Sequence, residues 1–252
     1  DAGTYNVTVT DAHGCSTELA AAVTIIQTGV VKPVAVPAAV TGCFGNSNGS
    51  VTLTVTDGQP PYTYNWSNGE TTQNISGVQA GVYYVTVNDV NGCSDATSAT
   101  VSEPPQLTAG VSSASTNVTC NGFADGTLSL DIAGGTPAYS YNWDNGETTA
   151  SLSGLAPGTY AVTVNDANGC TASTAGIVTE PLLLTANVSD YTDTLGCAAA
   201  GTGYIDIEVT GGTTSYTYAW SNGVTTEDIS GMSAGTFNVT VTDANGCTAE
   251  LN

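Results

Sequence analysis

Few side chains in this sequence could do chemistry. Its 252 residues include seven cysteines and 22 acidic residues, but only one histidine and one basic residue. Catalysis needs a nucleophile, a base or a metal held in a pocket, with a pKa matched to its task. His13 stands where three other copies of the same turn carry asparagine, which indicates a variant turn residue and not a general base. We therefore predict that the protein is not an enzyme, with no catalytic residues and no cofactor except calcium as a candidate.

Acidic residues recur in one setting and are the candidate metal ligands. An aspartate opens each Asp-x-Asn-Gly turn, and a glutamate precedes proline at two later positions. The calcium candidates are Asp89, Asp166, Asp243, Glu103 and Glu180. Calcium takes roughly six to eight oxygen ligands, and Asp and Asn at alternate loop positions could supply some of them. Asp in such a turn also accepts hydrogen bonds from backbone N–H groups two residues on, so we favour a structural role and keep calcium as the alternative.

The cysteines form two interleaved series, and two pairing schemes fit their spacing. Pairing within a repeat, which we favour, gives each unit its own bond and leaves Cys15 with a partner outside the chain. It joins Cys43 to Cys93, Cys120 to Cys170 and Cys197 to Cys247. Pairing across junctions instead joins Cys15 to Cys43, Cys93 to Cys120 and Cys170 to Cys197. A within-repeat loop would stabilise a small domain by about 4 kcal/mol. Metal or redox chemistry is disfavoured because the sequence has no Cys-x-x-Cys motif.

Pairs of tyrosines at alternate positions could form a glycan-binding surface. Tyr62 and Tyr64 share one face of an expected strand, as do Tyr139 and Tyr141. Aromatic rings on one face can stack on sugars, but they more often pack against a core or its rim. Trp66 has the same parity as Tyr62 and Tyr64, which favours the core.

The elements that must position these residues are repeated along the chain. The cysteine that follows Asn-Gly or His-Gly recurs at spacings of 78, 77 and 77 residues, and the other cysteines and the tryptophans recur at 77. Several features that recur at the same spacing indicate copies of one unit. The expected domains are 1–28, the C-terminal part of a truncated repeat, and immunoglobulin-like repeats at 29–104, 105–181 and 182–252, the last truncated at its C-terminal end.

Each repeat is expected to be all-β. Val51 and Leu53 alternate with threonines, and this period of two is typical of strands with one buried face. Asn-Gly pairs between such runs predict hairpins, because both residues tolerate positive φ. A tryptophan just before a hairpin turn favours an immunoglobulin-like sandwich with the indole in its core. Tyr83 and Tyr160 resemble a tyrosine corner, whereas Phe237 at the same position lacks the hydroxyl.

The fold class is therefore all-β, with tandem immunoglobulin-like β-sandwich domains arranged as an elongated rod. The rod is expected because the junctions are short and contain proline, which favours extended backbone.

Charge excludes two classes of partner. The formal net charge is −21 at pH 7, so the surface would repel nucleic acid and anionic membrane surfaces. No apolar stretch reaches the length of a membrane-spanning helix, so we expect no membrane insertion. Seven cysteines indicate an oxidising compartment, and we expect the protein outside the cell.

The combined pattern resembles the SprB-type repeat of Bacteroidota cell-surface gliding adhesins, and more distantly the PKD-like immunoglobulin folds. The resemblance rests on three segments of one repeat, Val118–Gly122, Gly134–Trp143 and Asn165–Cys170. The third repeat departs at its start, where Cys197 is followed by alanines in place of Asn-Gly. The resemblance implies a very large cell-surface protein exported by type IX secretion and carried by the gliding machinery.

We therefore expect a structural stalk or filament segment of a secreted adhesin, linked to gliding motility or surface attachment. Its expected partners are neighbouring repeats of the same chain, surface polysaccharide, and the secretion or gliding machinery. The alternatives are a glycan- or calcium-binding module, and a spacer array of a secreted enzyme.

Overall fold

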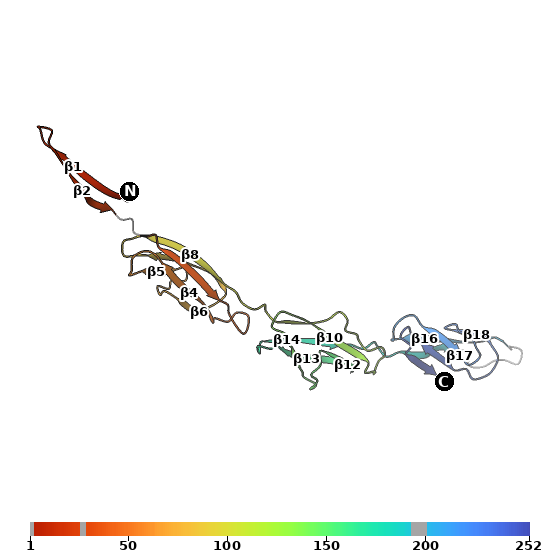
Figure 1. Cartoon of the computed structure of the whole chain (residues 1–252). Coiled ribbons are helices and arrows are strands. Elements are labelled where there is room, and N and C mark those ends of the chain that lie inside the picture. The colour runs from red at the N-terminus through yellow and green to blue at the C-terminus, as the bar shows by residue number, and fades with distance from the viewer. Residues whose placement is uncertain (1–2, 26–28, 193–200) are drawn as a thin grey trace. The chain divides into compact units, whose positions relative to one another are not determined.

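The computed structural model describes residues 3–25, 29–192 and 201–252, and within these ranges every regular element is a β-strand (Figure 1). The chain divides into two compact units, Asp1–Gln106 and Leu107–Asn252. Unit one holds a hairpin and the first repeat, and unit two holds the second and third repeats. All paired strands are antiparallel.

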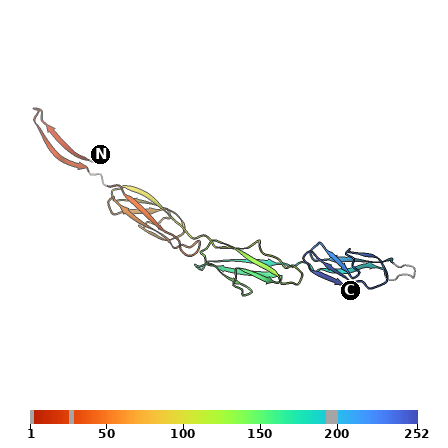
Figure 2. The same cartoon turned by 45° about the vertical axis from the view of Figure 1, so that its right-hand side comes forward.

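Unit one begins with a two-stranded ribbon, which both views of the chain show (Figures 1 and 2). The first repeat follows as two three-stranded sheets, with strand orders β3-β4-β6 and β5-β7-β8. The strands are β1 (Gly3–Thr10), β2 (Ser16–Ile25), β3 (Lys32–Ala38), β4 (Gly49–Thr56), β5 (Thr63–Trp66), β6 (Ile75–Val78), β7 (Gly81–Asn88) and β8 (Ser94–Val101).

Unit two repeats this arrangement twice. The second repeat has the sheets β12-β10-β9 and β11-β13-β14, and the third has β15-β16-β18 and β17-β19-β20. The second repeat contains β9 (Thr108–Val111), β10 (Gly126–Ala133), β11 (Ser140–Trp143), β12 (Ser151–Leu155), β13 (Gly158–Asn165) and β14 (Thr171–Val178). The third contains β15 (Thr185–Tyr191), β16 (Gly203–Thr210), β17 (Thr217–Trp220), β18 (Ile229–Met232), β19 (Val239–Thr242) and β20 (Thr248–Leu251). Each of these sheets lies within one of the expected ranges.

The core of each repeat lies between its two sheets, as the alternating sequence requires. In the first repeat Val51 and Leu53 of β4 are buried while Thr52 between them is exposed. Trp66 packs in the same cluster, and its indole Nε1 donates a hydrogen bond to the Thr72 carbonyl at 2.8 Å. Trp143 and Trp220 are buried in the same way in the other two repeats. The protein is thus a tandem array of immunoglobulin-like β-sandwiches.

The tyrosine corners form where the sequence predicts them. The Tyr83 hydroxyl donates to the Gln79 carbonyl at 2.9 Å, and the Tyr160 hydroxyl donates to the Ala156 carbonyl at 2.9 Å. Each bond ties the start of a late strand to the turn that precedes it.

Candidate functional site at the junction between repeats two and three

The first component of the junction is the turn between the last two strands of each repeat, which an aspartate holds. Asp166 Oδ1 accepts hydrogen bonds from the backbone N–H groups of Asn168 at 2.9 Å and Cys170 at 2.8 Å. Its Oδ2 accepts from the N–H of Thr136 at 2.8 Å, in the loop between β10 and β11. The aspartate therefore presents the cysteine at one end of the sandwich, which we call the N-terminal pole because the chain enters the repeat there.

The same arrangement recurs in the other repeats, and it shifts the pKa of the aspartate carboxyl groups. Asp89 and Asp243, like Asp166, are buried. Burial alone would raise the pKa of each carboxyl, but several backbone N–H donors favour the ionised form and together hold each pKa below its ordinary value. The aspartates are thus charged residues that stabilise a turn.

The glutamates serve the opposite end of the sandwich, the C-terminal pole, where the chain leaves the repeat. Glu180 Oε2 accepts a hydrogen bond from the N–H of Gly122 at 2.8 Å, and Glu103 Oε2 accepts one from Gly45 at 2.7 Å. In the second repeat the Asn121 amide also donates to the Pro181 carbonyl at 3.0 Å. These bonds hold the loop that carries Cys120 beside the departing chain.

In the part of the chain that the structure describes, the calcium candidates already have backbone hydrogen-bond partners. The three aspartates lie at N-terminal poles and the two glutamates at C-terminal poles, and each accepts hydrogen bonds from backbone N–H groups. Among the described residues no three His, Cys, Asp or Glu side chains form a group that could hold a metal ion. Calcium binding therefore gains no support from the placement of these residues.

At the junction the two poles meet through a disulfide. Cys120, in the second repeat, is bonded to Cys247, in the β19–β20 turn of the third, with a Cα–Cα distance of 5.7 Å and a sequence separation of 127. The Asn245 amide donates to the Thr119 carbonyl at 3.0 Å. The bond thus joins the C-terminal pole of one repeat to the N-terminal pole of the next.

Apolar side chains surround this bond. A cavity of about 170 Å³ lies beside it, and its lining includes Phe123, Leu182, Leu184 and both bonded cysteines. The linker is also tied down, because the Gly212 N–H donates to the Leu182 carbonyl at 2.8 Å. Substitution of Gly212 would be strained, since its φ is +60° and a Cβ there would lie 2.8 Å from an oxygen of Asp243. The junction therefore combines a covalent bond, hydrogen bonds and an apolar lining.

This bond corrects the expected pairing within repeats. Cys170 directly precedes β14, which has eight residues, and the segment of Cys120 lies beside its other end, where the Val118 N–H donates to the Thr179 carbonyl at 3.2 Å. At about 3.3 Å per residue the strand separates them by roughly 25 Å, whereas bonded cysteines need a Cα–Cα distance below about 7 Å. The pair Cys120–Cys170 is therefore wrong, and Cys197–Cys247 is wrong because Cys247 is bonded to Cys120.

The structure also contradicts two further expected pairs. Cys43 is disulfide-bonded while Cys93 is a free thiol, so Cys43–Cys93 is wrong, and so is the alternative pair Cys93–Cys120. Cys197 lies outside the described residues. Cys15 is a free thiol in the described structure, and a partner outside the chain stays a prediction.

The tyrosine pairs pack against the sandwich cores, as the favoured interpretation expects. Tyr62 and Tyr64 are partly buried against the first core, and Tyr139 and Tyr141 against the second. The hydroxyl of Tyr139 donates to the Gly134 carbonyl at 2.7 Å. These rings therefore do not form an exposed platform for sugars.

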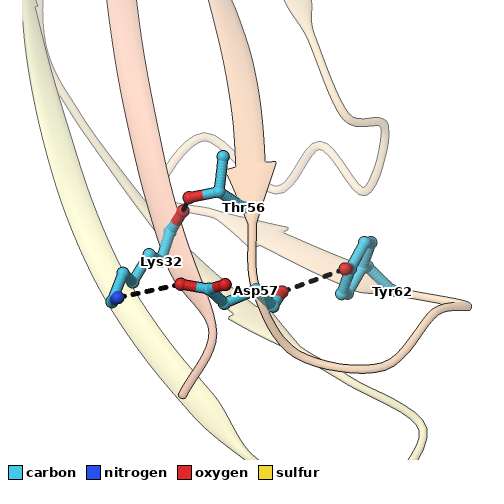
Figure 3. Close-up of polar contacts among 4 residues, drawn as sticks. All are labelled: Lys32, Thr56, Asp57 and Tyr62. Carbon is cyan, nitrogen blue, oxygen red and sulfur yellow. Dashed lines mark hydrogen bonds and ion pairs between the residues drawn. The ribbon is translucent and has the colours of Figure 1, made fainter. Parts of the chain in front are cut away.

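The one basic residue marks a local difference in the first repeat (Figure 3). Lys32 Nζ lies 2.8 Å from Asp57 Oδ2, and the hydrogen bond to Asp57 raises the pKa of this lysine. Asp57 has a φ of +64°, in the left-handed region where the other repeats have Gly134 and Gly211. The Tyr62 hydroxyl donates to the Asp57 carbonyl at 3.0 Å. An exposed ion pair contributes little to stability, so we assign it no role beyond this turn.

The fold and the junction define a class of protein, a disulfide-linked array of immunoglobulin-like repeats. The family model of the SprB repeat matches the chain three times, at residues 42–71, 112–148 and 192–225. The chain therefore carries three SprB repeats, as the resemblance predicted.

Three of the solved structures that the chain is similar to contain several immunoglobulin domains. Sidekick-1 immunoglobulin domains 1–5 share 14% identity over 100% of this chain and 66% of that one, with a TM-score of 0.38. The I-band fragment I67–I69 of titin shares 15% over 89% and 97%, with a TM-score of 0.34. The ectodomain of mouse nectin-like molecule 4 shares 14% over 60% and 65%, with a TM-score of 0.35. At these scores the likenesses carry no argument of their own. No curated protein matches the chain in sequence.

The repeat family and the disulfides indicate an extracellular protein of the adhesin type. No helix that could cross a membrane occurs in the part of the chain that the structure describes.

Proposed function

We propose that this chain is a tension-bearing stalk segment of a large cell-surface adhesin, and that it serves surface attachment or gliding. The observation that carries the proposal is the bond between Cys120 and Cys247, which joins successive repeats independently of the linker. A module that only bound a ligand would have no need of such a bond. In a stalk that transmits force, such a bond holds successive repeats together under tension.

The bond changes the path of force through the second and third repeats. Tension that enters at Leu107 reaches Cys120, crosses the disulfide to Cys247, and leaves toward Asn252. Residues 121–246 include ten of the twelve strands of the two sandwiches, and these residues lie off this path. The two domains are therefore shielded from unravelling while the bond is intact.

Single-molecule stretching tests this proposal. The chain is attached through position 106, where Gln106 is exposed, and through Asn252. With the bond intact, full extension should release only the residues outside the closed loop, roughly 65 Å of chain. The C120S/C247S double variant should release several times this length, because the strands of both repeats can then be pulled apart.

The Cys93→Ser variant is the matched control, since Cys93 is a free thiol, and it should stretch like the original chain. If the original chain released the full length of both repeats, force would not pass through the bond and the stalk proposal would lose its support.

The role in attachment or gliding needs a cellular test. Export by type IX secretion and movement by the gliding machinery belong to the proposal through the repeat family. Removal of the gene should reduce adhesion of cells to polysaccharide-coated surfaces or stop their movement, and cells that keep both would contradict this role. Titration calorimetry of the chain with calcium and with polysaccharides tests the binding alternatives, and micromolar sugar binding would contradict a purely mechanical stalk.

A further inference from the structure

The N-terminal pole of the first repeat has the same construction as the occupied pole of the third. Asp89 Oδ1 accepts hydrogen bonds from the N–H groups of Asn91 at 2.9 Å and Cys93 at 2.8 Å. Asp243 Oδ1 accepts them from Asn245 at 2.9 Å and Cys247 at 2.8 Å. The two cysteines are therefore presented by the same turn.

The surroundings of the two turns also correspond. In the first repeat Gly58 has a φ of +78°, and a Cβ there would lie 2.8 Å from Val31 Cγ2 and 3.5 Å from Asp89 Oδ2. In the third repeat, a Cβ on Gly212 would likewise lie close to an apolar side chain, that of Leu184, and to the carboxylate of Asp243. Both poles thus place a glycine and an apolar residue against the aspartate that holds the turn.

The two poles differ in what they bind. Cys247 holds a ligand, the loop around Cys120, through the disulfide and through the 3.0 Å hydrogen bond from Asn245 to the Thr119 carbonyl. Cys93 is a partly exposed free thiol, and Asn91 stands at the position of Asn245. The occupied pole therefore shows directly which ligand the other pole is built to take.

We propose that Cys93 is the acceptor of an inter-repeat disulfide, and that its ligand is the C-terminal pole loop of another SprB repeat placed ahead of the first. The ligand has the chemistry of the segment Val118–Gly122, a cysteine thiol next to a threonine carbonyl that accepts from the Asn91 amide. A bond of this kind joins the first repeat covalently to the repeat ahead of it.

Bond formation is a two-electron oxidation. The Cys93 thiol and the ligand thiol each give up a proton, an Sγ–Sγ bond forms, and the two electrons pass to a disulfide-carrying oxidant, which is reduced to two thiols. In the test this oxidant is a small-molecule disulfide.

The test extends the full chain by one rebuilt repeat. A copy of residues 105–155 is added ahead of Asp1, so that it continues into residues 1–28 in the register of the other repeats. The chain is oxidised under native conditions and its disulfides are identified by peptide mapping without reduction. We expect the peptide that carries Cys93 to be joined to the added copy of Cys120, and the Cys93 thiol to lose its reactivity with an alkylating reagent.

Cys15 provides an internal control, because it has the same turn in the rebuilt repeat but no further repeat ahead of it. It should stay reactive. An Asn91→Ala variant should form the Cys93 bond more slowly, by several-fold, if the amide orients the ligand, and its circular dichroism spectrum checks that the fold is kept. A Cys93 thiol that stays free while Cys120 and Cys247 bond, or that bonds to Cys15, would overturn the proposal.

Discussion

Cys120 and Cys247 belong to different sandwiches, yet their Cα atoms lie 5.7 Å apart and their sulfurs are bonded. The bond closes a loop that includes most of the second and third repeats. Stability and mechanical behaviour in this part of the chain should therefore be properties of the pair of repeats and not of each repeat alone.

Removal of this bond should destabilise both repeats together. Closure of a loop of 127 residues is worth about 5 kcal/mol by the loop-entropy relation. The C120S/C247S variant should therefore melt roughly 10–20 °C lower in calorimetry over the transition of these two repeats. Each single variant should lose as much as the double variant, because either one removes the whole bond, and additive losses would contradict this coupling.

Neutralisation of the turn aspartate should destabilise the second repeat. In Asp166→Asn the amide nitrogen would face the Thr136 N–H, a donor against a donor, where a carboxylate oxygen now accepts at 2.8 Å. We expect a loss of about 2 kcal/mol, measured by denaturant unfolding with Trp143 fluorescence. Asp131→Asn, at an exposed site on β10, is the matched control and should change stability by less than about 0.5 kcal/mol.

Acid should weaken the repeats through the same carboxyl groups. The folded-state pKa of Asp243 is lowered below the unfolded value of about 3.9, so its contribution is complete above that pH and is lost as pH falls through the folded pKa. The melting temperature of the chain should exceed that of Asp243→Asn at pH 7, and the difference should shrink below about pH 4. A difference independent of pH would show that the charge of this carboxyl is not what stabilises the turn.

The tyrosine corner should contribute through its hydroxyl. Tyr160→Phe removes the 2.9 Å bond to the Ala156 carbonyl and should cost about 1 kcal/mol in unfolding free energy. Tyr84→Phe changes an exposed tyrosine on β7 and serves as the control. Equal effects of the two variants would argue against a special role for the corner.

Much of the fold could be predicted because it depends on local pattern. The period of two places Val51 and Leu53 inside, the Asn-Gly pairs give turns with positive φ at glycines such as Gly169, and the recurring tryptophans mark the cores. Each of these features depends on residues that are close in the sequence. Because the sequence repeats every 77 residues, each feature recurs in every repeat.

The sequence by itself determined the repeats, their β-sandwich class, the turn role of the aspartates and the acidic surface. Only the tertiary structure decided the cysteine pairing. A periodic sequence is equally consistent with partners 50, 27 or 127 residues apart, because adding one 77-residue period changes no spacing within a repeat. The choice depends on which pole each cysteine occupies: an eight-residue strand keeps Cys120 and Cys170 of one repeat apart, and the junction brings Cys120 to Cys247.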